Sequence, residues 1–250
     1  MRHFITAILL LNTLLSKAQL SKEEIKTHHI YKVIEKYFKG KSFEEKTASY
    51  FDRKGNILKE TSGKDIESIT QQYEYENEKL KKVINYEFGH TTEYFYNPDG
   101  SYMTITTEKR IGAKNYFWFD SNGEAIKAFG GDTLFYKYNE LGKLEDIKAD
   151  SNGQVKFFAK FSYNQKGQLI KVESPKDEFT NTTESYEYDL NGKRIKAITK
   201  RDFHGMKSTS VSTYKYNKKG FLVKEITVDT NEEGKSATTK NIYEYEFYEN

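Results

Sequence analysis

Four consecutive aromatic residues, Tyr116 to Phe119, are the segment of this sequence best suited to bind a ligand, and they include the only tryptophan. Because successive side chains of a β-strand point to opposite faces, two of these rings should lie on each face. The pair Tyr116 and Trp118 is the candidate surface-binding pair, since exposed rings stack on sugars or pack against proteins. The favoured alternative is that the strand is covered on both faces, by an N-terminal helix, and that all four rings serve the core.

Catalytic and metal-binding patterns are absent from the sequence. His28 and His29 are adjacent, so they could not both face one metal from a helix, and His90 and His204 are isolated. The chain has no cysteine and no Gly-x-Ser-x-Gly segment. Because it has 37 acidic residues, the presence of paired carboxylates does not identify a catalytic site. Calcium-loop spacings are also missing. We therefore predict a non-enzymatic protein with no catalytic residue, no cofactor and no metal.

The aromatic strand belongs to a repeat that runs through most of the chain. Each copy has two aromatic residues one position apart, then Asp or Asn, two variable residues, Gly and an apolar residue. The clearest copies are Tyr136–Leu144, Tyr186–Gly192 and Tyr214–Leu222. The second aromatic position of successive copies is held by Phe51, Tyr75, Tyr96, Phe119, Tyr138, Tyr163, Tyr188, Tyr216 and Tyr245. Such a repeat determines the architecture, and it predicts about nine units in one domain over residues 42–250.

The residue order within a copy predicts a β-hairpin. In Tyr186–Tyr188 the two rings should face one side of a strand, as strand alternation requires. Asp or Asn then opens a four-residue type I turn, and the Gly that closes it adopts the left-handed conformation. A series of such hairpins predicts an all-β fold, a long coiled antiparallel meander sheet.

Two copies depart from the pattern. The copy with Tyr75 lacks the glycine and one residue, so the turn near Asn77 should be tighter. The last copy, Tyr243–Tyr248, stops before any turn and should form a closing edge strand, with charged residues that discourage further pairing.

Residues 19–41 differ from the repeats and are predicted to form an N-terminal cap. Apolar residues recur with helical spacing from Ile30 to Phe38, Ser21 and Glu24 match a capping box, and Gly40 suits the position after a helix. One amphipathic capping helix is therefore expected over residues 22–38, covering the end of the repeats. The alternative is an edge strand through His29–Phe38.

The first 18 residues have the layout of a secretory signal peptide. A basic start at Arg2 precedes an apolar run from Phe4 to Leu15, and small residues at Ser16 and Ala18 indicate cleavage after Ala18. No other apolar stretch is long enough to span a bilayer as a helix. We predict an extracytoplasmic protein (periplasmic, cell-surface or secreted) with no membrane span after signal removal.

Charge and composition narrow the choice of partner. Signal removal takes away Arg2 and Lys17 and no acidic residue, so the formal charge falls from +3 to +1. A nearly neutral chain does not favour nucleic acid or an anionic membrane. Without cysteine the fold depends on burial and strand pairing, to which 20 Tyr and 17 Phe contribute most. The mature protein is expected to be a monomer.

The motif Tyr-x-Tyr-[Asp/Asn]-x-x-Gly-x-Leu resembles the YD repeat of Rhs and teneurin-like proteins, over about residues 45–248. It is similar to the small exported type found in Bacteroidota-like bacteria. The resemblance implies hairpins that coil into a spiral antiparallel sheet, which in large members forms a shell around a toxin or an adhesive scaffold. This chain ends inside a repeat, so encapsulation is not expected of it. Single units bear a weaker resemblance to MORN-like antitoxin repeats.

The sequence thus predicts an exported, non-enzymatic repeat protein that presents a binding or scaffold surface to an unknown protein or glycan partner. Two alternatives stay open: an immunity or antitoxin-like protein that blocks an exported toxin, and a carbohydrate-active enzyme whose carboxylates the sequence does not single out. An outer-membrane barrel is disfavoured, because both faces of most strands carry Lys or Glu.

Overall fold

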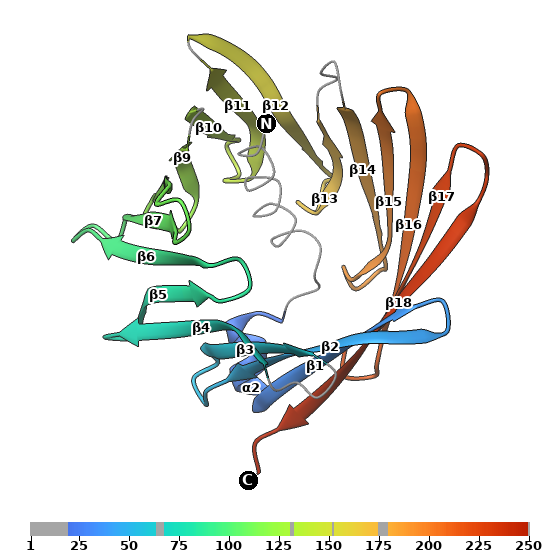
Figure 1. Cartoon of the computed structure of the whole chain (residues 1–250), viewed down its shortest axis with the longest axis horizontal. Coiled ribbons are helices and arrows are strands. Elements are labelled where there is room, and N and C mark those ends of the chain that lie inside the picture. Colours follow the sequence, from blue (N-terminus) through green and yellow to red (C-terminus); the bar gives the residue numbers. More distant parts are fainter. Residues whose placement is uncertain (1–19, 64–67, 131–132, 152, 175–179, 250) are drawn as a thin grey trace. The chain divides into compact units, whose positions relative to one another are not determined.

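The computed structural model describes residues 20–63, 68–130, 133–151, 153–174 and 180–249 (Figure 1). This part of the chain is all-β, with 18 strands and one short helix, α2 (Lys22–Thr27). Consecutive strands pair antiparallel, as a series of hairpins requires. None of the helices in this part is long and apolar enough to cross a membrane. The predicted signal peptide and its cleavage site after Ala18 lie outside the described residues.

The chain divides into two compact units. Unit 1 contains the N-terminal residues to Ile34, Thr47–Thr133 and the C-terminal residues from Tyr245; unit 2 contains Glu35–Lys46 and Leu134–Glu244. Four strands contribute to both units: β1 (Ile30–Lys39), β2 (Ser42–Phe51), β18 (Ser236–Phe247) and β10 (Thr133–Tyr138), of which only the first residue, Thr133, belongs to unit 1.

The remaining strands follow one another along the chain. Those of unit 1 are β3 (Ile57–Gly63), β4 (Ser68–Glu76), β5 (Lys79–Asn85), β6 (His90–Tyr96), β7 (Tyr102–Glu108), β8 (Lys114–Phe119) and β9 (Ala125–Phe129). Those of unit 2 are β11 (Leu144–Ser151), β12 (Gln154–Tyr163), β13 (Leu169–Glu173), β14 (Thr180–Tyr188), β15 (Arg194–Phe203), β16 (Met206–Tyr216) and β17 (Leu222–Asn231).

The Asx–Gly turns fold as the sequence predicts. In the turn from Asp52, the carboxylate oxygen Oδ1 accepts the N–H groups of Lys54 and Asn56, each at 2.8 Å. The Gly55 N–H donates to the Asp52 carbonyl at 3.0 Å, and the φ of Gly55 is +80°. A Cβ on Gly55 would also collide with the carbonyl oxygen of Lys22. Glycine is therefore required at this turn for its conformation and for the close approach of α2.

The second aromatic of a copy is displaced by a β-bulge and hydrogen-bonds to the preceding hairpin. The strand register shifts directly before Tyr75, Tyr163, Tyr188 and Tyr216. Five tyrosine hydroxyls donate to backbone carbonyls at 2.7–3.0 Å: Tyr75 to Ile57, Tyr96 to Leu80, Tyr163 to Leu144, Tyr188 to Leu169 and Tyr216 to Arg194. Sequence reasoning assigned these rings to burial alone, but their hydroxyls also connect neighbouring copies.

The predicted capping helix over residues 22–38 is wrong beyond its first turns. The capping box is present, since the Glu24 N–H donates to Ser21 Oγ at 3.1 Å and the Ser21 N–H donates to the Glu24 carboxylate at 2.8 Å. The helix nevertheless ends at Thr27, and His29 has a φ of +54°. The residues from Ile30 onward form β1, close to the alternative of a strand. Their β-branched and aromatic side chains suit a strand, and pairing outweighs the helical spacing of the apolar residues.

The prediction that the last strand is an edge strand is also wrong. Strand β1 pairs with both β18 and β2, so it lies between the last strand and the second. In unit 1 the Tyr248 N–H donates to the His29 carbonyl, and in unit 2 the Gly40 N–H donates to the Thr238 carbonyl, each at 2.8 Å. The segment predicted as a helix supplies the partner that the last repeat lacks.

The turn without glycine is tighter, as expected. Only Asn77 and Glu78 separate β4 from β5, and their φ values are +50° and +64°. Two left-handed residues between paired strands form the type I′ arrangement, which matches the strand twist.

The two faces of the sheet differ in chemistry. The tyrosine face carries the first aromatic residue of the copies: Tyr73 and Tyr94 in unit 1, and Tyr136, Tyr186, Tyr214 and Tyr243 in unit 2. Tyr186 and Tyr214 are buried, and Phe161 holds the same position in its copy and is buried as well. The other side of each unit is called the opposite face below.

Candidate functional site

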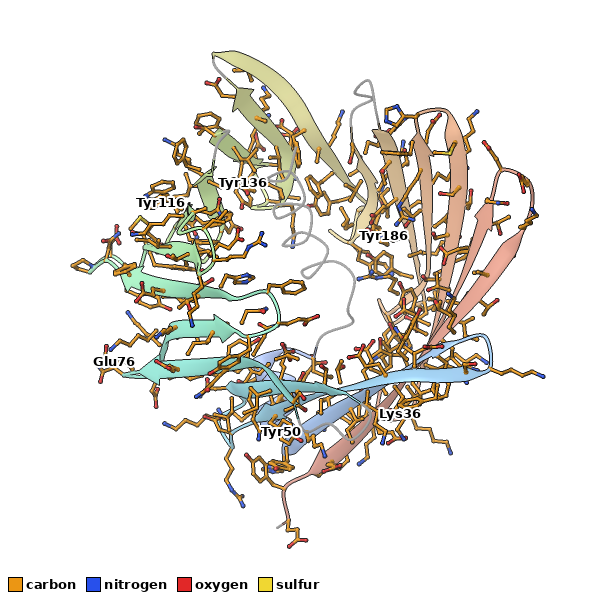
Figure 2. The ribbon with its side chains drawn as sticks, viewed as in Figure 1. Lys36, Tyr50, Glu76, Tyr116, Tyr136 and Tyr186 are labelled. Atoms are coloured by element: carbon orange, nitrogen blue, oxygen red, sulfur yellow. The ribbon has the colours of Figure 1, made fainter. Side chains whose placement is uncertain are left out.

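Strand β8 carries the predicted candidate pair, and its four rings alternate between faces as expected. Phe117 is in register with Thr104 and Ala128, both buried on the tyrosine face of unit 1. Tyr116, which Figure 2 labels, and Trp118 therefore share the opposite face, as the strand register requires. Their rings are stacked, with centroids 6.1 Å apart and planes inclined by 22°. The strand thus presents two nearly parallel rings side by side on one surface.

Neighbouring strands extend this pair into a larger surface, here called the aromatic patch: Phe95, Met103, Tyr116, Trp118 and Phe129. Met103 on β7 pairs with Phe95 on β6 and with Trp118 on β8, and Phe129 on β9 pairs with Tyr116. Phe95 and Phe129 are 47% and 46% exposed, while Tyr116 and Trp118 are partly exposed. Sequence reasoning found the central pair but missed the flanking residues, because only the strand register brings them together.

Lysines border the aromatic patch. Lys127, in register with Trp118, holds its ammonium 5.6 Å from the centre of the indole ring, a cation–π contact. Lys114 is exposed and lies two residues before Tyr116 on the same face of β8. The nearest in-register acid on this face, Glu93, is separated from Tyr116 by Ile105 and is in register with Lys82. The charge next to the central rings is therefore positive.

A second cluster of polar groups lies on the tyrosine face of unit 2. The Tyr243 hydroxyl is 3.3 Å from carboxylate oxygens of both Glu35 and Glu225. Burial, together with the charge of Glu35, raises the pKa of Glu225 above its usual value. Burial and the two carboxylates also raise the pKa of Tyr243. No sequence pattern indicates this cluster, because its members come from β1, β17 and β18, which are far apart in the chain.

Similar tyrosine–carboxylate contacts recur on this face. In unit 1 the Tyr73 hydroxyl lies 3.2 Å from the Glu60 carboxylate, and in unit 2 the Tyr186 hydroxyl donates to Glu184 (Figure 2). The Arg194 guanidinium lies over the Tyr186 ring, 5.0 Å from its centroid. Burial raises the pKa of Tyr186 above its usual value, as does the negative charge of Glu184. These groups satisfy one another, as buried polar groups in a folded protein do.

The histidines stay separate in the structure. His28 and His29 follow the end of α2, His90 stacks on Phe88 with centroids 6.1 Å apart, and His204 contacts Phe203. Burial lowers the pKa of His90. Within the described ranges, no group of three or more His, Cys, Asp or Glu residues is arranged to hold a metal ion.

Comparisons with known proteins give no family for this chain. No protein-family model matches it, and neither does any curated protein sequence. The resemblance to YD repeats therefore has no family match to confirm it.

Several solved structures match at low similarity. A porin-like protein from Bacteroides uniformis ATCC 8492 is 14% identical with a TM-score of 0.47, over 87% of this chain and 98% of that protein. A porin-like protein from Bacteroides vulgatus ATCC 8482 is 12% identical with a TM-score of 0.41, over 88% and 98% of the two chains. TcdB2–TccC3 without its hypervariable C-terminal region is 14% identical with a TM-score of 0.35, over 77% of this chain and 14% of that one. All three TM-scores are below 0.5, and the similarity does not indicate a shared function.

Proposed function

We propose that the mature chain is an exported, non-enzymatic binding protein that holds a glycan on the aromatic patch. The observation that carries this proposal is the stacked pair of Tyr116 and Trp118 on one face of β8. Aromatic rings in this arrangement offer flat apolar surfaces to the C–H faces of sugar rings. The sheet backbone fixes the spacing of the rings, so little side-chain freedom is lost on binding.

A glycan fits this surface better than a protein partner does. Stable protein interfaces bury roughly 800 Å² per partner around a central cluster of anchors. The aromatic patch spans four strands, and Lys82, Glu93 and Lys127 lie at its edge in the same cross-strand rows. A row of two rings suits a short stretch of a sugar chain, which needs few contacts per ring.

We expect this protein to be surrounded by water rather than by lipid. On the opposite face of unit 2, three successive strands carry Lys196, Lys215 and Lys224, and Lys196 forms an ion pair with Glu187 at 3.1 Å. A lipid-facing surface would need an uninterrupted apolar band at these positions. Export is proposed from residues 1–18, and mass spectrometry of the exported protein would detect an N-terminus at Gln19.

The sole tryptophan makes the proposal directly testable. Titration of residues 19–250 with oligosaccharides, chosen from a glycan array, is expected to change the fluorescence of Trp118. The variant Trp118→Ala should lose binding at least tenfold, whereas Tyr86→Ala, at an exposed ring in the β5–β6 turn, should bind normally. Equal binding by both variants would contradict the proposal, as would hydrolysis of the glycan. Circular dichroism confirms that each variant is folded.

A further inference from the structure

The charges around the aromatic patch indicate which kind of glycan it selects, a step that rests on the proposed function. Lys114 and Lys127 border the central rings on two sides: Lys114 precedes Tyr116 along β8, and Lys127 lies beside Trp118 on β9. The segment between β7 and β8 adds Lys109 and Arg110, both exposed.

Two acidic residues near the patch are engaged elsewhere or lie further away. Glu93 is in register with Lys82 and is separated from the central rings by β7. Asp120, in the turn after β8, accepts the N–H groups of Asn122 and Glu124 at 2.9 Å, so its charge serves the turn. A ligand on the two rings therefore lies beside the Lys127 ammonium, which is over the indole ring.

We propose that the patch selects anionic polysaccharides, whose sugar rings stack on Tyr116 and Trp118 while carboxylate or sulfate groups bind Lys114 and Lys127. Uronic acid and sulfated sugars share this chemistry, because both carry a negatively charged group as a substituent of the sugar. The Lys127 ammonium, which contacts the indole ring in the free protein, exchanges this cation–π contact for an ion pair with the ligand.

Single-stranded nucleic acid also combines flat rings with negative charge, and it fits less well. Such a ligand carries a phosphate on every nucleotide and requires a basic groove that follows its backbone. Two lysines beside the patch, in a mature chain with a formal charge of +1, do not form such a groove. Binding of an oligonucleotide therefore serves as an overturning outcome in the test.

The test uses calorimetry on residues 19–250 and compares four probes: alginate oligosaccharides, sulfated oligosaccharides and neutral cello-oligosaccharides of equal length, and a single-stranded oligonucleotide. The acidic probes are expected to bind at least tenfold more tightly than the neutral probe at low salt. This preference should shrink as salt screens the charges. The acidic probe that binds more tightly, alginate or the sulfated sugar, identifies the anionic group that the patch prefers.

Variants distinguish the contribution of the lysine charges to binding from that of the aromatic rings. The double variant Lys114→Gln/Lys127→Gln is expected to lose the preference for acidic probes, so that it binds acidic and neutral probes with similar affinity. The control Lys200→Gln/Lys215→Gln, on the opposite face of unit 2, removes two charges elsewhere and should bind as the wild type does. Trp118→Ala should weaken binding of every probe.

The outcomes distinguish this inference from the function on which it rests. Equal affinity for acidic and neutral sugars, or a preference that survives in the lysine double variant, overturns the inference and leaves glycan binding intact. No binding of any sugar overturns both. Tighter binding of a single-stranded oligonucleotide than of any sugar also overturns both.

Discussion

At the scale of residues, tyrosine performs two different tasks in this protein. In the first aromatic position it lies on the tyrosine face, where the hydroxyls of Tyr73, Tyr186 and Tyr243 meet carboxylates. In the second position its ring is half-buried and its hydroxyl caps a carbonyl of the neighbouring hairpin. Phenylalanine could fill the same volume in either position but could make neither bond.

The hydrogen bonds that tyrosine hydroxyls donate to neighbouring copies should contribute measurably to the stability of the fold. Tyr188→Phe removes the donor to the Leu169 carbonyl, a bond of 2.7 Å, and should lower the free energy of unfolding by about 1 kcal/mol. Urea unfolding followed by circular dichroism measures this change. Tyr37→Phe, at an exposed ring, is the control and should change stability by less than about 0.5 kcal/mol. Equal effects of the two variants would show that the hydroxyl bonds contribute nothing.

The buried carboxylate Glu225 should make stability depend on pH in a specific direction. Its raised pKa means that the folded state binds the proton more tightly than the unfolded state does. The resulting stabilisation is complete below the usual pKa of 4.5 and is lost as pH rises through the folded-state value. Glu225→Gln, which cannot ionise, should therefore melt higher than wild type at about pH 8 and show no such gain at about pH 4.

A surface substitution provides the comparison for this pH effect. Glu187→Gln changes an exposed carboxylate that pairs with Lys196, and it should give no gain at either pH. A gain for Glu225→Gln that is largest in acid would contradict the assignment of a raised pKa.

At the scale of elements, the hairpin is the unit that sequence reasoning predicts well. The Asx–Gly turns, the tight turn at Asn77 and the alternation of rings on β8 all follow from local rules, because each depends on residues a few positions apart. The fate of Ile30–Phe38 could not be predicted in the same way. Its apolar residues fit a helix stripe and a strand, and the choice depends on partners in β2 and β18.

A substitution in the two-residue turn between β4 and β5 should raise the stability of the protein. Glu78 adopts a φ of +64°, which strains any residue with a Cβ and suits glycine. Glu78→Gly should raise the melting temperature even though the exposed ion pair with Lys54 is lost. Glu78→Ala loses the same ion pair and keeps the strain, so it should melt below Glu78→Gly. The opposite order would show that the ion pair, rather than the backbone, governs this turn.

At the scale of the whole molecule, the all-β class and the repeat could be predicted, whereas the candidate site could be predicted only in its centre. Tyr116 and Trp118 follow from the sequence, but Phe95, Met103 and Phe129 join them through the register of β6 to β9. The division into two units and the pairing of β1 with β18 also depend on contacts between distant residues. Local patterns contain no information about such contacts.

Deletion of the C-terminal residues should destabilise the protein more than deletion of an unpaired chain end would. Deletion of residues 245–250 removes the bond from the Tyr248 N–H to the His29 carbonyl, the bond from its hydroxyl to the Phe51 carbonyl, and the ion pair of Lys32 with Glu246. The shortened chain should melt at a lower temperature and aggregate through the unpaired edge of β1. Thermal unfolding and light scattering measure both effects. Deletion of residues 249–250 alone should leave them unchanged.

The position of β1 between the last and the second strand also sets an order of events during synthesis. Lys32 and Glu246 are 214 residues apart, so one side of β1 has no partner until almost the entire chain has been made. Contacts between such distant residues fold slowly. One edge of β1 therefore exposes unpaired N–H and C=O groups on the growing chain until β18 has been made.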